Sequence, residues 1–224
     1  MSSITDPPTS SVPSPVNRLH VALLLSAAAV LVWSGIFPKD RFTWLMETLP
    51  AMVGGAILVA AYRRFRFTTI TYVLAWFFAL ILMIGGHWTY AEVPIGNWVR
   101  DAFNLSRNHY DRFGHFFQGV IPAMFARELL LRTSPLRRGK WLFFTCISMA
   151  LAISAAYELF EWQYAVMTGG EQADNLLGSQ GDIWDAQKDM GLALLGGTLS
   201  LLLLGCVQDR QMPAAIAASA GRRM

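Results

Sequence analysis

Long apolar stretches alternate with short polar segments along most of this chain. Each stretch is close to the roughly 20 residues that an α-helix needs to cross the hydrocarbon core of a bilayer. A backbone surrounded by lipid must satisfy its hydrogen bonds within its own segment, so these stretches are expected to be helices. The pattern predicts a bundle of about six transmembrane helices, at residues 20–37, 45–62, 69–86, 112–131, 141–166 and 188–207.

The composition agrees with a polytopic membrane protein of the all-α class. Of the 224 residues, 54% are hydrophobic and only 15% are charged. We expect a disordered N-terminal tail at residues 1–19, because this segment is rich in proline, serine and threonine and has little apolar surface to bury. The six-helix transmembrane domain then occupies residues 20–207, and a short basic C-terminal tail occupies residues 208–224.

The first apolar stretch has a second interpretation. Residues 1–35 also contain a short apolar run with small residues, as a cleaved signal peptide does. The long leader, rich in proline and poor in charge, favours a retained membrane span.

Lysine and arginine gather in alternate polar segments, and this bias predicts the orientation. Six spans place both termini on the same side of the membrane. The two tails and the second and fourth loops hold eleven basic residues, whereas the other loops and their adjoining helix ends hold six. The positive-inside rule therefore places both termini in the cytoplasm. Because the basic residues report topology in this way, we expect the lipid bilayer, and no nucleic acid, as a partner.

The acidic residues show the opposite bias. Nine of the fifteen lie in the third and fifth loops or at the external ends of the adjoining helices, together with three of the four histidines. An acidic loop can simply be solvated, so Asp101, Glu171 and Asp174 are interpreted as surface residues. The other acids and histidines fall in four short segments, HWTYAE, RNHYDRFGHF, AAYELFEW and GDIWDAQKDM.

Spacing within these segments favours a shared site. Residues three or four apart lie on one face of a helix. Asp111 and His115 are four apart, and Glu158 and Glu161 are three apart. The segment GDIWDAQKDM places three aspartates at spacings of three and four. Because an ionised carboxylate that faces hydrocarbon is costly unless it is paired, protonated or hydrated, these groups should point into the bundle.

Histidine and carboxylate groups in this arrangement are typical ligands of divalent metals, and helical bundles build such sites from facing helices. We therefore predict a site for one or two divalent ions, with zinc, manganese, iron and magnesium all compatible. The expected ligands are Asp111, His115, Glu158, Asp182, Asp185 and Asp189. Further candidate site residues are His87, Glu92, Arg107, His109, Arg112 and Glu161.

Two other interpretations of these groups remain open. In the first, Arg107, Arg112 and Lys188 neutralise the acids in a salt-bridge network, although three cations leave an excess among at least six acids. In the second, His87 and His115 ligate a haem, for which an acidic pocket is an unusual environment. The chain contains no His-Glu-x-x-His, Gly-x-Ser-x-Gly or P-loop motif, which argues against the corresponding enzyme classes.

The segments RNHYDRFGHFFQG, YELFEW and GDIWDAQKDM also support a family resemblance. From about residue 70 to 207 the chain resembles the YjdF-like family of bacterial inner-membrane proteins, a domain of unknown function. The resemblance implies a multi-pass protein of the bacterial inner (plasma) membrane. It implies no reaction, substrate or ligand set.

Three functions are compatible with the sequence. The first is a metal-dependent membrane enzyme that acts at the external leaflet on a lipid-linked or anionic substrate, with Arg107 or Arg112 holding an anionic group. The second is a proton- or cation-coupled transporter that uses the same carboxylates. The third is a non-catalytic membrane scaffold. A transporter needs polar residues that continue through the membrane, and the middle of the spans is apolar. The sequence therefore favours the enzyme over the transporter.

Overall fold

The computed structural model describes residues 16–170 and 176–220, and every regular element in these ranges is a helix. This confirms the all-α class. The helices are α1 (Arg18–Ser34), α2 (Arg41–Ala61), α3 (Thr69–Trp88), the 3₁₀ helix η1 (Tyr90–Glu92), α4 (Pro94–Ala102), α5 (Tyr110–Thr133), α6 (Lys140–Thr168) and α8 (Asp185–Ala220).

A helix covers most of each predicted membrane span. Four of them, α2, α3, α6 and α8, are long and apolar enough to cross a membrane. Helix α1 has only 17 residues, and α5 interrupts its apolar face with charged side chains such as Arg127 and Glu128. The number of spans and their orientation therefore remain predictions. Helix α8 continues through residues 208–220, with Pro213 inside it.

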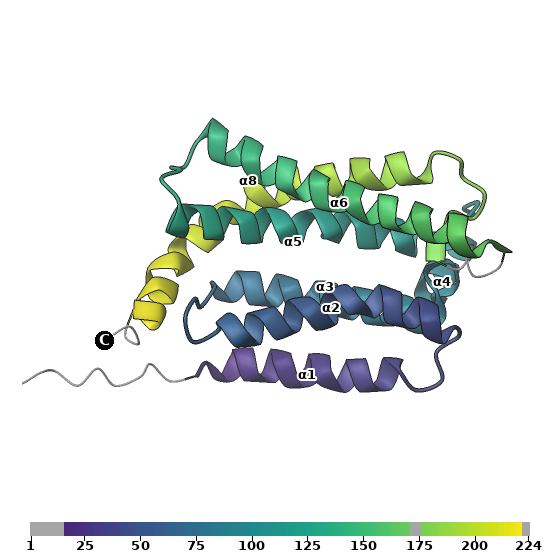
Figure 1. Cartoon of the computed structure of the whole chain (residues 1–224), viewed down its shortest axis with the longest axis horizontal. Coiled ribbons are helices and arrows are strands. Elements are labelled where there is room, and N and C mark those ends of the chain that lie inside the picture. Colours follow the sequence, from purple (N-terminus) through teal and green to yellow (C-terminus); the bar gives the residue numbers. More distant parts are fainter. Residues whose placement is uncertain (1–15, 171–175, 221–224) are drawn as a thin grey trace, which may run out of the picture.

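The helices form two layers that lie side by side (Figure 1). One layer contains α1, α2 and α3, and the other contains α5, α6 and α8. Helix α3 packs on α1 and α2 within its own layer and on α5 across the interface. The described chain begins and ends at one end of the bundle, and the short helix α4 lies at the opposite end, which we call the α4 end (Figure 1).

Helices α5 and α8 both start at the α4 end and run parallel at very close range. A Cβ atom added at Gly119 would lie 1.8 Å from the carbonyl oxygen of Ala193, so no larger residue fits there without a backbone shift. Such small residues let membrane helices approach closely. One turn nearer the α4 end, the same register brings His115 of α5 opposite Asp189 of α8.

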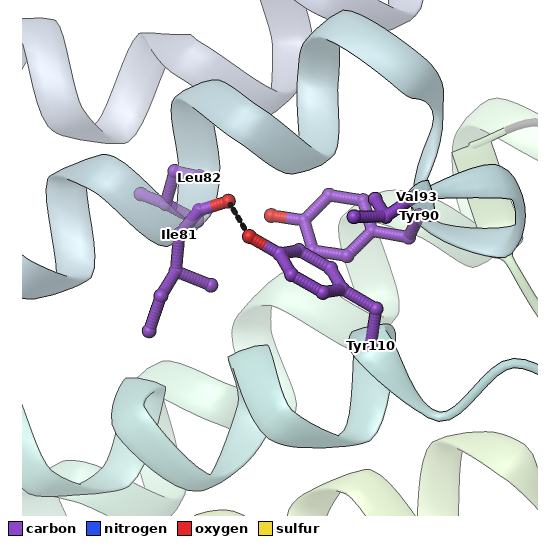
Figure 2. Packing of buried hydrophobic residues seen from close by; sticks show 5 residues of the cluster. All are labelled: Ile81, Leu82, Tyr90, Val93 and Tyr110. Atoms are coloured by element: carbon purple, nitrogen blue, oxygen red, sulfur yellow. Dashed lines mark hydrogen bonds between the residues drawn. The ribbon is translucent and has the colours of Figure 1, made fainter. Parts of the chain in front are cut away.

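An apolar cluster at the α4 end joins α3, η1 and α5. Its buried members are Ile81, Leu82, Tyr90, Val93 and Tyr110 (Figure 2). The hydroxyl of Tyr110 donates a hydrogen bond of 3.0 Å to the carbonyl oxygen of Ile81. The ring centroids of Tyr90 and Tyr110 are 5.7 Å apart. The cluster fixes the start of α5, and with it the side chains of Asp111 and His115, against the first layer.

Candidate functional site

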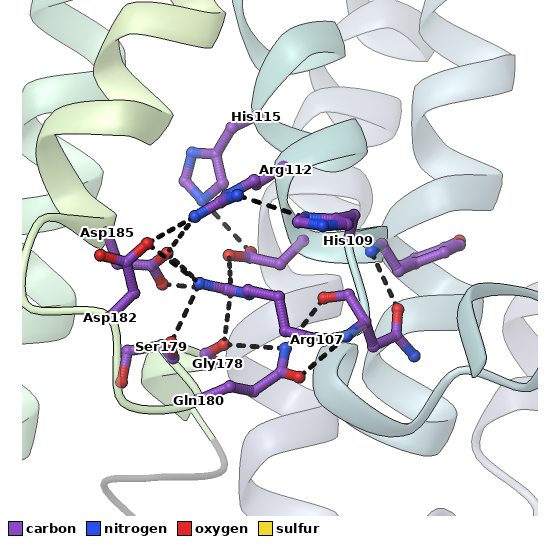
Figure 3. Close-up of polar contacts among 12 residues, drawn as sticks. Arg107, His109, Arg112, His115, Gly178, Ser179, Gln180, Asp182 and Asp185 are labelled. Atoms are coloured by element: carbon purple, nitrogen blue, oxygen red, sulfur yellow. Dashed lines mark hydrogen bonds and ion pairs between the residues drawn. The ribbon is translucent and has the colours of Figure 1, made fainter. Parts of the chain in front are cut away.

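Arg107 ties the segment before α5 to the segment before α8 (Figure 3). Its side chain is buried, and both terminal nitrogens donate to the carboxylate of Asp185. The same nitrogens donate to the carbonyl oxygens of Ser179 and Gly178, each at 2.9 Å. These contacts engage Nη1 and Nη2, which makes Arg107 a clamp between the two segments.

A second pair of contacts holds Asp182. Arg112 and Lys188 each place a side-chain nitrogen 2.6 Å from its Oδ2. The hydrogen bond from Lys188, the backbone N–H of Trp184 and the charge of Arg112 together lower the pKa of Asp182 below its ordinary value. Two of the predicted metal ligands, Asp182 and Asp185, are therefore paired with basic side chains.

His109 lies beside this pair, with its Nδ1 3.3 Å from Nη1 of Arg112. Partial burial, followed by the positive charges of Arg112 and Arg107, lowers the pKa of His109. The neutral form of His109 is thus favoured at neutral pH, which suits a group that accepts a hydrogen bond from Arg112.

His115 lies deeper in the bundle and faces acceptors on both sides. Its Nε2 is 3.4 Å from Oδ1 of Asp111, and its Nδ1 is 3.4 Å from Oε1 of Glu158. The Nδ1 atom also lies 2.9 Å from Oε1 of Gln118. Since a neutral imidazole has only one N–H, two acceptor-facing nitrogens need either a second proton or a cation.

Two overlapping triads around this histidine have the composition of a metal site. One consists of Asp111, His115 and Asp189, and the other of His115, Glu158 and Glu161. Within each triad the candidate ligand atoms lie within 4.8 Å of one another. Ligand atoms that share a zinc ion lie about 2.0–2.2 Å from it, so small side-chain movements suffice to close either triad on an ion.

Two carboxylate oxygens in these triads lack a hydrogen-bond partner among the described residues. They are Oδ1 of Asp189 and Oε1 of Glu158. Asp189 is 2% exposed, so it lies out of contact with bulk solvent. A buried polar atom without a partner is costly, and a bound ion would satisfy it.

Glu47 of α2 completes the group, although the sequence pattern did not predict it as a site residue. It is buried, and the hydroxyl of Tyr157 on α6 donates to its Oε2 at 3.1 Å. The available signal was a single carboxylate inside the apolar stretch 45–62.

A cavity of about 130 Å³ adjoins these side chains. Glu47, Asp111, His115 and Glu161 line one part of it, and Phe78, Leu82, Ile121 and Ile153 line another. The cavity therefore combines a charged part with an apolar part.

Two predicted site residues lie away from this cluster. His87 contacts the end of α1, where its Nδ1 is 2.9 Å from the carbonyl oxygen of Ser34 and its ring stacks on Trp33. Glu92 forms an exposed ion pair with Lys39. The structure thus brings together Asp111, His115, Glu158, Glu161 and Asp189, with Asp182, Asp185 and the two arginines beside them.

Comparison with known proteins agrees with the resemblance found in the sequence. Residues 19–210 match a family described as predicted membrane protein (DUF2238). The chain is 45% identical over 188 residues to the inner membrane protein YjdF of Escherichia coli (strain K12), an alignment that covers 84% of this chain and 90% of that protein. No solved structure matches significantly.

Proposed function

We propose that this inner-membrane protein is a metal-dependent enzyme. The chain belongs to the DUF2238 family of predicted membrane proteins, and its Escherichia coli relative is likewise an inner-membrane protein. One observation supports this function above the others. Four largely buried carboxylates gather around His115, and within residues 16–170 and 176–220 none of them forms an ion pair with arginine or lysine. They are Glu47, Glu158, Glu161 and Asp189.

Charge balance gives the physical reason. A buried carboxylate without a compensating charge is strongly destabilising, and one histidine supplies at most one positive charge for four acids. Protons shared among the acids can restore the balance, and so can a divalent cation. Histidine with carboxylates is a common ligand set for zinc, iron and manganese, so an ion at either triad accounts for both the residue types and their geometry.

The chemistry proposed for such an ion is hydrolysis. A divalent ion makes bound water acidic enough to act as a nucleophile near neutral pH. The water oxygen would form a new bond to the carbon or phosphorus of an ester, and the bond to the leaving oxygen would break. With the ion held by Asp111, His115 and Asp189, Glu161 would be free to accept the proton from the water and return it to the leaving oxygen. Arg112, whose side chain is 21% exposed, is better placed than the buried Arg107, whose side chain is 6% exposed, to hold an anionic group of the substrate.

The transporter alternative has less support. A transport path needs polar groups that continue through the bundle. Beyond His115 and Asp189, the interface between α5 and α8 closes on small residues, where Gly197 lies against Ala123 and the neighbouring Ala150 of α6. Among the described residues, the buried polar side chains between the cluster and Arg127 are the hydroxyls of Ser154 and Ser200, and charged groups resume at Arg127, near the other end.

Metal analysis of detergent-purified protein tests the proposal. We expect a stoichiometric divalent ion in the wild type and its loss in Asp189→Asn, with helix content and unfolding temperature retained. Asp101→Asn is the matched control, because Asp101 is exposed and, within the described part of the chain, pairs only with the adjacent Arg100. A folded wild type that binds none of zinc, manganese, iron or magnesium, even after incubation with each, would exclude the proposed function.

A further inference from the structure

The cavity beside His115 opens toward the side of the bundle. At its charged part Glu47, His115 and Glu161 are at most 5% exposed, so the α4 end of the molecule is closed over them. Pro50 and Ile153 line the same cavity and are exposed, Ile153 to 47%. Both residues lie near the middle of helices long and apolar enough to span the membrane. The exposed rim therefore lies at the depth of the lipid chains.

The rim lies between the two layers of helices. Helix α2 packs mainly on α3, whereas α6 packs on α5 and α8. Near the α4 end, α2 and α6 are bridged by the hydrogen bond from Tyr157 to Glu47 and by the rings of Phe42 and Tyr164, stacked with centroids 5.0 Å apart. Pro50 and Ile153 lie further toward the other end of the bundle than these two bridges.

The lining changes character along the cavity. On α5 it extends from Asp111 to Pro122, which at 1.5 Å per residue corresponds to about 16 Å along the helix. The part nearest Asp111 is charged, and Phe78 and Ile121 line the part further from it, with Leu82 nearer the α4 end. This succession fits a molecule with one polar end and one hydrocarbon end.

We propose that the hydrocarbon chain of a membrane lipid enters sideways between α2 and α6 and lies against Phe78, Leu82 and Ile121, so that its headgroup reaches the cluster around His115. This inference rests on the proposed function and names its substrate class, a lipid with an ester or phosphoester bond near the headgroup. A chain in this position replaces bilayer contacts with apolar protein contacts, while the bond to be broken lies beside the carboxylates.

Photolabelling in vesicles tests the entrance. The full-length protein is reconstituted in phosphatidylethanolamine and phosphatidylglycerol that include a phospholipid with a diazirine in its acyl chain. After illumination, labelled residues are mapped by mass spectrometry. We expect label on Leu82 and Ile121, which are at most 9% exposed and do not face the surrounding bilayer. Leu202 on α8, which is 63% exposed, should be labelled in every sample as an internal reference.

A variant that fills the rim makes the test specific. Ile153→Trp should lower the label on Leu82 and Ile121 about tenfold relative to Leu202, equivalent to about 1.4 kcal/mol against chain occupancy. Leu159→Trp is the matched control on the same helix, because Leu159 is 63% exposed and does not line the cavity. Unlabelled Leu82 and Ile121 in the wild type would overturn the inference. An equal decrease in both variants would do the same.

Metal content measured on the same samples separates the two proposals. Label inside the cavity of a metal-free protein would keep the lipid entrance and reject the enzyme. A stoichiometric metal without internal label would keep the metal centre and reject the entrance.

Discussion

The Nε2 atom of His115 lies 3.4 Å from Oδ1 of Asp111, one helical turn earlier on α5. On the other side of the ring, Nδ1 lies 3.4 Å from Glu158. Imidazole is a good zinc ligand, whereas magnesium prefers carboxylate oxygens. We expect His115→Asn to weaken zinc binding at least about tenfold and to change magnesium binding less. Calorimetric titration of the purified protein with each ion measures both affinities.

The control for this selectivity is His109→Asn. His109 contacts Arg112 outside the two triads, so its loss should leave both affinities unchanged. Equal losses for zinc and magnesium in His115→Asn would indicate a general effect on folding. Unchanged zinc binding would contradict a role for His115 as a ligand.

The sequence predicted the parts of this site that depend on one helix at a time. Asp111 and His115 share a face because of their spacing on α5, and a spacing of three residues does the same for Glu158 and Glu161 on α6. Spacing alone did not distinguish Asp189 from Asp185. That difference depends on where Arg107 lies, and Arg107 is 78 residues away from Asp185 in the chain.

The sequence pattern did not predict which residues make contact between the two layers of helices. Glu47 reaches the cluster because α2 lies across from α6, and no local periodicity reports this. Helix α4 was not predicted either, since its nine residues lack the long apolar run that identified the other helices. The apolar stretches, in contrast, located the long helices because burial in lipid constrains every residue of a span.

Arg107 should contribute more to stability than any exposed basic residue. It is buried, and its loss would leave Asp185 and two backbone carbonyls without their donor. Removing one partner of a buried ion pair typically costs about 3–5 kcal/mol. We expect Arg107→Ala to lower the free energy of unfolding by about this amount in mixed micelles. Arg100→Ala, which breaks an exposed pair with Asp101, should cost at most about 1 kcal/mol. Similar losses for the two variants would refute the clamp.

Through Asp182, the stability of the α4 end is expected to depend on pH. The hydrogen bond from Lys188, the backbone N–H of Trp184 and the charge of Arg112 hold its pKa below the ordinary value of 3.8. A carboxylate with a lowered folded-state pKa stabilises the fold fully above its ordinary pKa, and this contribution disappears as the pH falls through the lowered value. The difference in unfolding temperature between wild type and Asp182→Asn should therefore be constant from pH 7 to about pH 5 and shrink toward about pH 3. A difference that grows on acidification would contradict this ion pairing.

The position of the chain ends predicts the topology. The described chain begins and ends at the same end of the bundle (Figure 1), which indicates an even number of membrane crossings. The number is six if α1 and α5 cross the membrane together with the four long apolar helices. Reporters that are active on one side only, fused after Arg64, after Ala102 and after Met224, should place the first and third in the cytoplasm and the second outside. A C-terminal reporter outside the cytoplasm would show that one helix does not cross, and the 17-residue α1 would be the first to examine.

Glu128 provides a comparison for the site, because it is a buried carboxylate whose partners are complete. Its side chain is fully buried at the end of the bundle opposite α4. It accepts hydrogen bonds from the backbone and hydroxyl of Thr68, from Thr71 and Gln208, and from Arg132 at 2.8 Å. These contacts join α3, α5 and α8, so the group acts as a structural connection and needs no ion.

We therefore expect Glu128→Ala to cost about 3–5 kcal/mol, since it removes the carboxylate partner of the largely buried Arg132 side chain and leaves other donors without their acceptor. Glu128→Gln retains an acceptor and should cost less. Glu92→Ala removes only an exposed partner of Lys39 and should cost at most about 1 kcal/mol. Equilibrium unfolding in mixed micelles gives all three values, and metal content should not change in any of them. A metal lost with Glu128→Gln would show that the two ends are coupled and that the carboxylates around His115 do not hold the ion on their own.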